Sequence, residues 1–360
     1  MSNKSKLDSD FLFKHNVVKE LLKENKCDTL LLVSEQNRLW FTNFAATFGF
    51  LFINKNKSIL VTDGRYFEAA QKSIKNTEVV LFEGFKTIEA VSKKINVNKL
   101  AIEGEYLTYN YELLLNKLCE EKVVISSQLL RSIKTPNELK IMQAVVDITA
   151  KVGNNLSKWI KPNMTEIDLV KKITIELINA GGEKNSFDPI VASGPNGSSP
   201  HHHSTNRKML LGEFVTCDFG TMYKGYCSDI TRTLVVGNKP KNQQLINAYR
   251  VVDEANRKGI SKCKSGIKGS DLDQVCRDYI SKTEFKNYFV HSTGHGVGLD
   301  VHELPNVSPS YDKELPENSI VTIEPGIYIP KVGGIRIEDM VLVKNKKSIW
   351  MSEKIYRPKF

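Results

Sequence analysis

The 360-residue sequence has few of the features that mark membrane or secreted proteins. The apolar segment FGFLFI, at residues 48–53, is far too short to span a bilayer, and the N-terminus has no apolar stretch of signal-peptide length. The six cysteines form no C-x-x-C pair, and a chain of this size needs no disulfide bonds. We therefore expect a cytoplasmic protein that has no membrane partner and buries most of its cysteines.

Dense basic runs are also missing, although the formal net charge is +10. The lysines are dispersed, and they stand mostly beside Asn, Glu or Ser rather than between aromatic residues. Proteins that bind nucleic acids cluster their basic residues on one face or along one helix. A solvated lysine-rich surface explains the charge, so we expect no nucleic-acid partner.

The pattern along the chain predicts two domains, 1–132 and 133–360, of α+β (mixed α/β) class. The first third alternates helical patterns with short strand candidates, which is typical of a mixed or parallel sheet. Thr135-Pro136-Asn137-Glu138 is a helix-start signal, and the following part is rich in strands. Early strands are expected at 29–34, 40–44, 48–53 and 58–64, and later helices at 136–159, 165–180, 244–262 and 270–282.

Two aspartates, Asp218 and Asp229, lie in an apolar segment that reads as a hairpin. If the chain folds back about Tyr223–Lys224, these residues are directly opposite, and Gly225 provides the positive φ that the turn needs. Like charges placed directly opposite each other repel. A cation between them would remove the repulsion; the alternative is an exposed hairpin with solvated aspartates.

Three of the seven histidines, His291, His295 and His302, are concentrated in the glycine-rich segment HSTGHGVGLDVHE. Glycines let the backbone pass close to a ligand. A single buried histidine is more often a hydrogen-bonded core residue, but three within twelve residues favour a ligand or catalytic role.

Two further carboxylates, Glu324 and Glu338, lie in apolar segments that are expected to be strands. Glu324 ends an apolar strand before a Pro-Gly turn, and Glu338 shares one strand face with Arg336. A buried carboxylate has to be paired, protonated or bound to a metal. For Glu338 an ordinary ion pair with Arg336 on a solvated strand is the alternative.

Together, one imidazole and four carboxylates form a set rich in oxygen ligands: Asp218, Asp229, His295, Glu324 and Glu338. Such a set can hold two divalent ions about 3.5–4 Å apart. Few nitrogens and no thiolate favour Mn²⁺, with Co²⁺ or Zn²⁺ able to substitute. Two such ions lower the pKa of a shared water and polarise a carbonyl, so the set predicts a hydrolase.

The order of these motifs resembles the pita-bread metallopeptidases. D-x-G, G-Y-x-S-D-I-T-R-T, H-x-T-G-H-G-x-G-L-D-V-H-E, E-P-G-I-Y and G-I-R-I-E-D follow one another from about residue 132 to the C-terminus, and the subfamily they resemble is aminopeptidase P and prolidase. Asn37-Arg38-Leu39, Gly49 and Thr62-Asp63-Gly64-Arg65-Tyr66 resemble landmarks of the creatinase-type N-terminal domain. The resemblance implies a creatinase-like α/β domain followed by a pita-bread catalytic domain.

The resemblance also assigns roles to individual positions. It implies that the five ligands bind the two ions and that Glu324 is the general base. It places His201 against the substrate, His291 and His302 in the pocket, and Tyr328 and Arg336 in positions that orient substrate or support ligands. His202 and His203 follow His201 directly, so which of the three faces the site stays open.

The implied activity is Xaa-Pro aminopeptidase, which removes the N-terminal residue from peptides with proline at position two by means of a metal-bridging hydroxide. Three alternatives stay open: an Xaa-Pro dipeptidase restricted to dipeptides, a pita-bread domain used only for binding, and hydrolysis of a creatine-type C–N bond. The binding domain and the C–N hydrolase are expected to lack part of the ligand set, which is complete here. The resemblance further suggests a homodimer.

Overall fold

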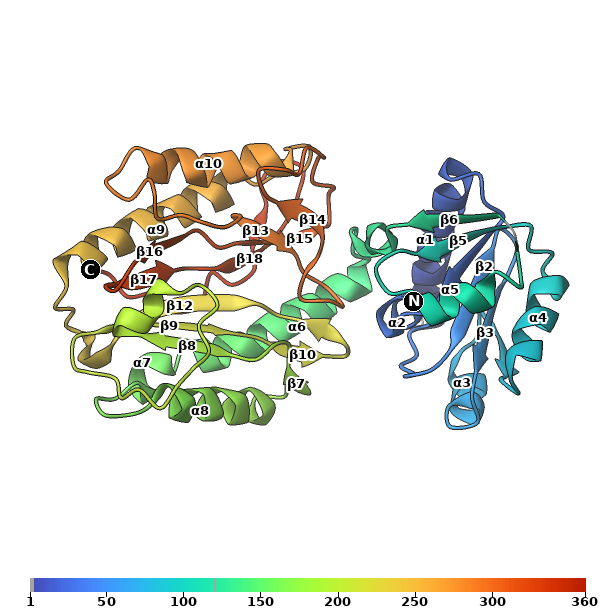
Figure 1. Ribbon diagram of the computed structural model, residues 1–360, viewed down its shortest axis with the longest axis horizontal. Coiled ribbons are helices and arrows are strands. Elements are labelled where there is room, and N and C mark those ends of the chain that lie inside the picture. The colour runs from blue at the N-terminus through green and yellow to red at the C-terminus, as the bar shows by residue number, and fades with distance from the viewer. Residues whose placement is uncertain (1–2, 120) are drawn as a thin grey trace. The chain divides into compact units, whose positions relative to one another are not determined.

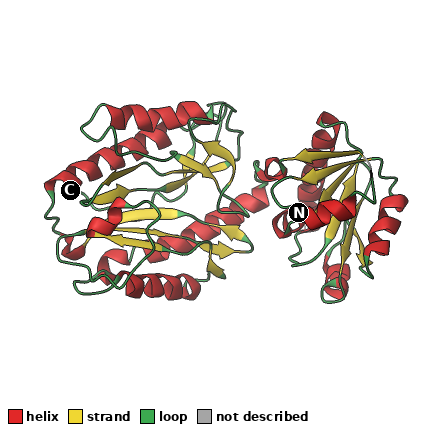
Figure 2. Ribbon diagram, in the orientation of Figure 1, coloured by secondary structure: helices red, strands yellow, loops and turns green. Residues whose placement is uncertain are grey.

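The computed structural model describes residues 3–119 and 121–360, and the chain divides into two compact units, Met1–Arg131 and Ser132–Phe360. Figures 1 and 2 show that each unit combines helices with a sheet or sheets. In the described part of the chain, no helix combines the length and the apolar character needed to cross a bilayer.

The first unit is built on one six-stranded mixed sheet of order β4-β3-β2-β1-β5-β6. Strands β1, β2 and β3 pair antiparallel, and the remaining pairs are parallel. Apolar side chains of the sheet and of α4 form its buried core. The elements are α1 (Asn3–Glu24), β1 (Thr29–Leu32), α2 (Glu35–Thr42), β2 (Phe50–Asn54), β3 (Ser58–Thr62), α3 (Phe67–Ser73), β4 (Glu78–Leu81), α4 (Phe85–Lys94), β5 (Lys99–Glu103), α5 (Tyr109–Leu115) and β6 (Glu121–Ile125).

The strand predicted at residues 40–44 is wrong, because most of this segment belongs to helix α2. The Ser34 side chain caps the helix by accepting a hydrogen bond from the Asn37 N–H, and Asn43 ends it in the left-handed conformation. Trp40 and Phe41 are buried from within this helix. The aromatic residues predict that this segment is buried, which is correct. They do not distinguish a strand from a helix, whereas the capping residue Ser34 favours the helix.

The second unit contains helices on two sides of several small antiparallel sheets. Thr135 and Glu138 form the capping box that starts α6, and the predicted helix over 136–159 is divided into two. The helices are α6 (Pro136–Gly153), α7 (Leu156–Trp159), α8 (Glu166–Asn179), α9 (Gln243–Lys262) and α10 (Gly269–Ser281). Figure 1 shows α9 and α10 on one outer side of the strands and α8 on the other.

The sheets of this unit have the strand orders β11-β10-β7, β12-β9-β8, β14-β13-β15-β18-β19 and β16-β17. The core beneath α9 and α10 is apolar. The strands are β7 (Lys184–Asn185), β8 (Ile190–Ser193), β9 (Phe214–Phe219), β10 (Thr221–Tyr223), β11 (Tyr226–Cys227), β12 (Ile230–Val235), β13 (Gly294–Gly296), β14 (Glu303–Val307), β15 (Ile320–Ile323), β16 (Gly326–Ile329), β17 (Gly333–Arg336), β18 (Asp339–Leu342) and β19 (Ile349–Trp350).

The predicted hairpin exists, but its register is shifted by two from the prediction. Asp218 pairs with Thr231 rather than with Asp229. The reason is the turn, whose two central residues are Lys224 and Gly225, both with positive φ. The two aspartates are therefore diagonal neighbours on one face of adjacent strands, which reduces the repulsion that direct opposition would cause.

The shifted register places Gly220 where the backbone of the next strand passes very close. A Cβ atom on Gly220 would lie 1.9 Å from the carbonyl oxygen of Ser228, the residue before Asp229. No side chain fits at this position without moving the strand that carries the aspartate. Glycine is thus required here by close approach rather than by φ.

Gly220→Ala is expected to destabilise the protein by about 1–3 kcal/mol or more, since the added methyl group overpacks a buried backbone crossing. Gly64→Ala is the matched control, because a Cβ there meets nothing within 4 Å. Calorimetric unfolding of the full chain measures both. Equal melting temperatures for the two variants would contradict the interpretation.

Candidate metal centre

One cavity of the second unit, with a volume of about 560 Å³, collects almost all residues predicted to act in the site. Most residues that line the cavity are polar or charged, and Phe187, Ile190 and Val301 are among the apolar ones. The predicted residues on its wall are His201, Asp218, Asp229, His291, His295, His302, Glu324, Arg336 and Glu338. Cys217 and Cys227 are buried, as expected for most of the cysteines, and do not line it.

The five proposed ligands come from the ends and edges of different strands. Asp218 lies in β9, and Asp229 directly precedes β12. His295 is in β13, Glu324 follows β15, and Glu338 connects β17 to β18. The N–H of Glu338 donates to the carbonyl of Thr231 in β12 at 3.1 Å, which joins two of these ligand-bearing segments.

Three of the five residues can place one ligand atom each within 4.8 Å of one another: Asp229, His295 and Glu338. Glu324 is close to the same point, because its Oε1 lies 3.4 Å from His295 Nε2. Asp229 Oδ2 lies 3.6 Å from that nitrogen. Carboxylate oxygens of two residues thus lie within 3.6 Å of His295 Nε2.

The hydrogen bonds of His295 decide what Nε2 offers to these oxygens. Its Nδ1 lies 3.1 Å from the carbonyl oxygen of Gly296, which can only accept a proton. Burial lowers the pKa of His295 to about 3, so the ring is neutral with its proton on Nδ1. Nε2 therefore presents a lone pair to the carboxylates, which is the tautomer that binds metals.

The carboxylates themselves resist ionising together in the absence of a cation. Burial, and then the neighbouring Glu338 and Asp218, raise the pKa of Asp229 well above its usual range. Burial and Glu338 likewise raise the pKa of Glu324. The pKa of Glu338 rises to about 7, again chiefly through burial. A divalent cation would offset this mutual repulsion.

Asp218 provides a further test of whether these residues fit a metal. Its Oδ2 accepts a hydrogen bond from Arg336 Nη2 at 2.6 Å, whereas its Oδ1 is buried and has no hydrogen-bond partner among the described residues. A buried carboxylate oxygen without a partner is costly unless something coordinates it. The orphaned oxygen, the imidazole lone pair and the crowded carboxylates all fit a divalent metal ion.

Arg336 also belongs to a chain of hydrogen bonds along the cavity. Its Nη1 donates to the hydroxyl of Tyr328 at 2.8 Å, and that hydroxyl lies 2.9 Å from His291 Nε2. His291 Nδ1 faces the carbonyl oxygen of Ser292 at 2.8 Å, so Nδ1 carries the proton and Nε2 accepts from Tyr328. Burial lowers the pKa of His291 to about 4, which keeps the ring neutral.

Tyr328 contacts two residues of the cavity wall but is not part of that wall. It is buried and does not line the cavity, whereas His291 and Arg336 do. The pair Arg336–Glu338, considered as the ordinary alternative, does not form, because the ion-pair partner of Arg336 is Asp218. Both Arg336 and Glu338 are buried rather than solvated.

The three adjacent histidines have different surroundings. His201 lines the cavity. His202 Nε2 lies 2.9 Å from Glu166 Oε2, and the Glu166 carboxylate also accepts from the backbone N–H groups of Ser193 and Thr205. Glu166 therefore fixes the loop on which His201 stands. The structure brings His201, and neither of the other two, to the cavity wall.

His302 lies beside His295, with ring centroids 4.1 Å apart. Burial lowers the pKa of His302 as well. The sequence interpretation missed the polar groups on the same wall, Asp188, Asn306, Ser308 and Ser310. It also missed Thr231, whose hydroxyl donates to Glu338 Oε2 at 2.8 Å. The alternation along β12 could have indicated Thr231, since it follows Asp229 by two.

The raised carboxyl pKa values predict how the stability of the metal-free protein depends on pH. A carboxyl group whose pKa is raised in the folded state stabilises that state below its unfolded pKa, and the stability is lost as the pH rises through the folded pKa, about 7 for Glu338. The histidines with lowered pKa act in the opposite direction, but only below about pH 6.5, where they protonate on unfolding.

Between pH 6.5 and 8 the carboxylates therefore dominate, and the melting temperature in chelator is expected to fall as the pH rises. Glu338→Gln should flatten this fall, because the substitution removes one of the titrating groups. Calorimetry across the pH series measures the effect. A wild-type melting temperature that is constant or rises over this window would contradict the prediction.

Comparison with known proteins places the chain in a family. The profile of the metallopeptidase family M24 matches residues 140–345, and that of the Creatinase/Prolidase N-terminal domain matches residues 15–134. A "Putative Xaa-Pro aminopeptidase" of Mycoplasma genitalium is 53% identical over 350 residues, covering 97% of this chain and 99% of its own.

Solved structures agree with this assignment. The Xaa-Pro dipeptidase from Bacillus anthracis is 35% identical, with a TM-score of 0.91 and coverage of 95% of this chain and 98% of its own. The prolidase from Pyrococcus furiosus is 32% identical, with a TM-score of 0.85 and coverage of 93% and 98%. With a creatinase-type N-terminal domain and a pita-bread catalytic domain, the chain belongs to metallopeptidase family M24.

Proposed function

We propose that the protein is an Xaa-Pro aminopeptidase, which hydrolyses the bond between the first residue of a peptide and a proline at position two. The observation that carries the proposal is the convergence of carboxylates on the lone pair of His295 Nε2 at the wall of a cavity. In this assignment, residues 1–132 are the creatinase-type domain and residues 133–360 are the catalytic domain. The family match and the similarity to the M. genitalium protein support it.

The donor set suits two divalent ions, and among them Mn²⁺ best, because the ligands are mainly carboxylate oxygens with one imidazole; Co²⁺ or Zn²⁺ could substitute. The residues that would hold the ions are Asp218, Asp229, His295, Glu324 and Glu338. When bound, the ions would lower the pKa of the attacking water and polarise the scissile carbonyl.

The remaining residues of the cavity have roles that follow from their positions. Glu324, at the cavity wall and 3.4 Å from His295, would act as general base and take the proton of the attacking water. His201 and His302 would contact the substrate and stabilise the charge that develops on its carbonyl oxygen. His291 would act beside them, its tautomer fixed by Tyr328 and Ser292.

An Xaa-Pro bond is a tertiary amide and has no N–H group. General peptidases that need this donor handle the bond poorly. A site that attacks through the carbonyl alone does not depend on the donor, which fits an enzyme dedicated to this bond. The free amine of the first residue would be held by a metal or by the acidic wall of the cavity, confining cleavage to the N-terminus.

A dipeptidase is the second candidate, because the B. anthracis and P. furiosus proteins are named Xaa-Pro dipeptidase and prolidase. The two activities differ in whether chain beyond the proline is accepted. Turnover of Arg-Pro-Pro against Ala-Pro separates them. Efficient cleavage of the tripeptide supports the aminopeptidase, and cleavage of the dipeptide alone supports the dipeptidase.

The central test is hydrolysis of a panel of Xaa-Pro peptides by metal-stripped protein with and without added Mn²⁺. Activity is expected only with the metal, and Asp229→Asn should abolish most of it, since the amide replaces a proposed ligand. Peptides with alanine in place of proline serve as the substrate control. Full activity of Asp229→Asn would refute the two-metal assignment.

His201→Ala is expected to lower kcat/KM by about 100–1,000-fold, the usual effect of removing one group that stabilises the developing oxyanion. His203→Ala is the matched control, because His203 is exposed and does not line the cavity. The steady-state kinetics of both variants on one Xaa-Pro peptide measure the difference. Equal losses in the two variants would show that His201 has no specific role.

We also propose a cytoplasmic location and a homodimer. All six cysteines are free thiols, and five of them are buried, which suits a reducing compartment. Large apolar side chains of the first unit are exposed, among them Leu12, Tyr109, Leu113 and Val124, and an interface between copies would bury such side chains. Sedimentation of the purified protein measures its mass.

A further inference from the structure

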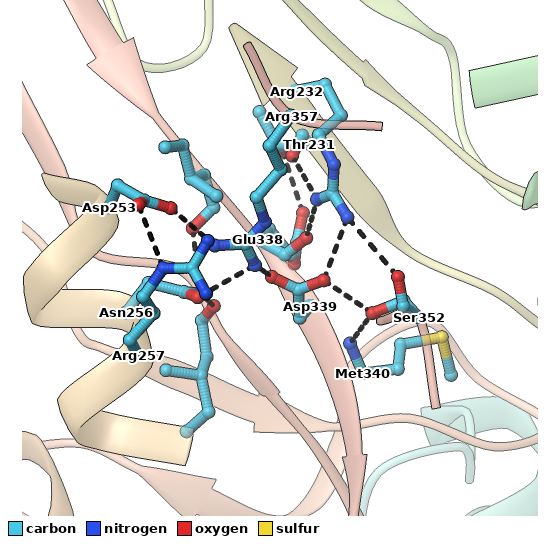
Figure 3. Close-up of polar contacts among 12 residues, drawn as sticks. Thr231, Arg232, Asp253, Asn256, Arg257, Glu338, Asp339, Met340, Ser352 and Arg357 are labelled. Atoms are coloured by element: carbon cyan, nitrogen blue, oxygen red, sulfur yellow. Dashed lines mark hydrogen bonds and ion pairs between the residues drawn. The ribbon is translucent and has the colours of Figure 1, made fainter. Parts of the chain in front are cut away.

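A buried polar network lies behind the proposed metal ligands, on residues that have no role in the chemistry proposed above. Figure 3 shows Arg232 and Arg357 approaching the carboxylate of Asp339, the residue that follows Glu338. Asp339 is fully buried, and the hydroxyl of Ser352 donates to its Oδ1 at 2.6 Å. The network connects the ligand-bearing strands to helix α9 and to the C-terminal segment.

Arg232 holds the main chain at Glu338 itself. Its Nη1 donates to the carbonyl oxygen of Glu338 at 2.6 Å and to that of Thr231 at 2.9 Å, and its Nη2 donates to Asp339 Oδ1 at 2.9 Å (Figure 3). Thr231 in turn binds the Glu338 carboxylate through its hydroxyl. The main-chain carbonyl and the side-chain carboxylate of Glu338 are thereby both hydrogen-bonded to residues of β12.

Asn256, in α9, holds the main chain next to both Glu324 and Glu338. Its Nδ2 donates to the carbonyl oxygens of Ile323 at 2.6 Å and of Ile337 at 3.2 Å. These carbonyls belong to the peptide groups that join Ile323 to Glu324 and Ile337 to Glu338. Because each peptide group is planar, the amide of one side chain sets the orientation of the backbone entering both residues.

The N–H groups of the same two peptides are held from the other side. The Glu324 N–H donates to the carbonyl oxygen of Thr293 at 2.7 Å, and the Glu338 N–H donates to that of Thr231 at 3.1 Å. Thr293 lies two residues before His295, and Thr231 two residues after Asp229. Asn256 therefore completes a set of contacts that relates four of the proposed ligands to one another.

Arg357 fixes the orientation of the Asn256 amide. Its Nη2 donates to Asn256 Oδ1 at 2.9 Å, which leaves Nδ2 facing the two carbonyls (Figure 3). Its Nη1 donates to Asp253 Oδ1 at 2.7 Å, and the guanidinium also pairs with Asp339. The planar fork of arginine can satisfy these partners together, whereas the single ammonium of lysine cannot reproduce its geometry.

We propose that Asn256 and Arg357 are positioning residues of the metal centre, which set the separation and orientation of Glu324 and Glu338 for metal binding. The proposal rests on the ligand roles assigned under the proposed function. Apolar side chains of similar volume would fill the same space without the desolvation that buried charges and amides require. Partners behind the ligands commonly change metal affinity by about 10–100-fold when they are substituted.

Titration calorimetry of Mn²⁺ into the metal-stripped full-length protein tests the proposal. Asn256→Leu removes both donors to the carbonyls, and Arg357→Met removes the group that orients Asn256. Each is expected to weaken Mn²⁺ binding by about 10–100-fold. Arg357→Lys should give a smaller loss, because it keeps the charge but lacks the fork.

Arg257→Met is the matched control. Arg257 stands next to Asn256 and pairs with Asp253 at 2.9 Å, but its side chain is 45% exposed and no hydrogen bond or ion pair joins it to either carbonyl or to Asp339. Its Mn²⁺ affinity should equal that of the wild type. A loss as large as that of Arg357→Met would overturn the proposal, because it would reflect a general effect of removing charge from Asp253.

Unfolding of each variant in chelator and in saturating Mn²⁺ separates positioning from simple stability. A positioning role predicts that the metal-dependent rise in melting temperature shrinks. Lower melting temperatures in chelator combined with unchanged Mn²⁺ affinity in Asn256→Leu and Arg357→Met would overturn the proposal. If Asn256→Leu does not fold, Arg357→Lys decides by the same affinity criterion.

Glu338→Gln distinguishes this proposal from the proposed function. Wild-type affinity in Glu338→Gln would remove the ligand assignment and the present proposal with it. Reduced affinity in Glu338→Gln together with wild-type affinity in the Asn256 and Arg357 variants would overturn the positioning role alone. Reduced affinity in all three variants supports both.

Discussion

The main constraint on the second unit is the electrostatic repulsion between carboxylates that are buried around one neutral imidazole. Asp229, Glu324 and Glu338 have pKa values raised by burial and by one another. A charged histidine ring would reduce the repulsion between these carboxylates. The ring of His295 is neutral instead, and its Nε2 presents a lone pair to them. Such an arrangement is costly for a protein alone and favourable for a protein with divalent cations, since cations supply the missing positive charge.

The remaining scaffold holds these groups in place against their mutual repulsion. The proposed ligands lie in or next to separate strands, so their spacing depends on contacts between strands and not on local conformation. Hydrogen bonds from Thr231, Arg232 and Asn256 fix the main chain or the carboxylates of Glu324 and Glu338. The cavity beside them is bordered by histidines, and desolvation lowers the pKa of His291 to about 4 and that of His302 below its usual value.

Local sequence signals account for most of the helices and for their ends. The capping box at Thr135 and Glu138 starts α6 where the sequence predicts it, and the predicted helix at 165–180 is α8. The segment at 40–44 is the exception, because burial of Trp40 and Phe41 is compatible with either a strand or a helix. Periodicity cannot separate the two over five residues, and the cap at Ser34 decides.

By itself the sequence determined which side chains to propose for the site, since acidic residues buried in apolar segments have to be paired, protonated or bound to a metal. Only the tertiary structure decided how they meet. The turn at Lys224 and Gly225 sets the register that makes Asp218 and Asp229 diagonal neighbours, and the fold pairs Arg336 with Asp218. The placement of Asn256 behind Glu324 and Glu338 depends on the packing of α9, a contact between distant segments that no local pattern encodes.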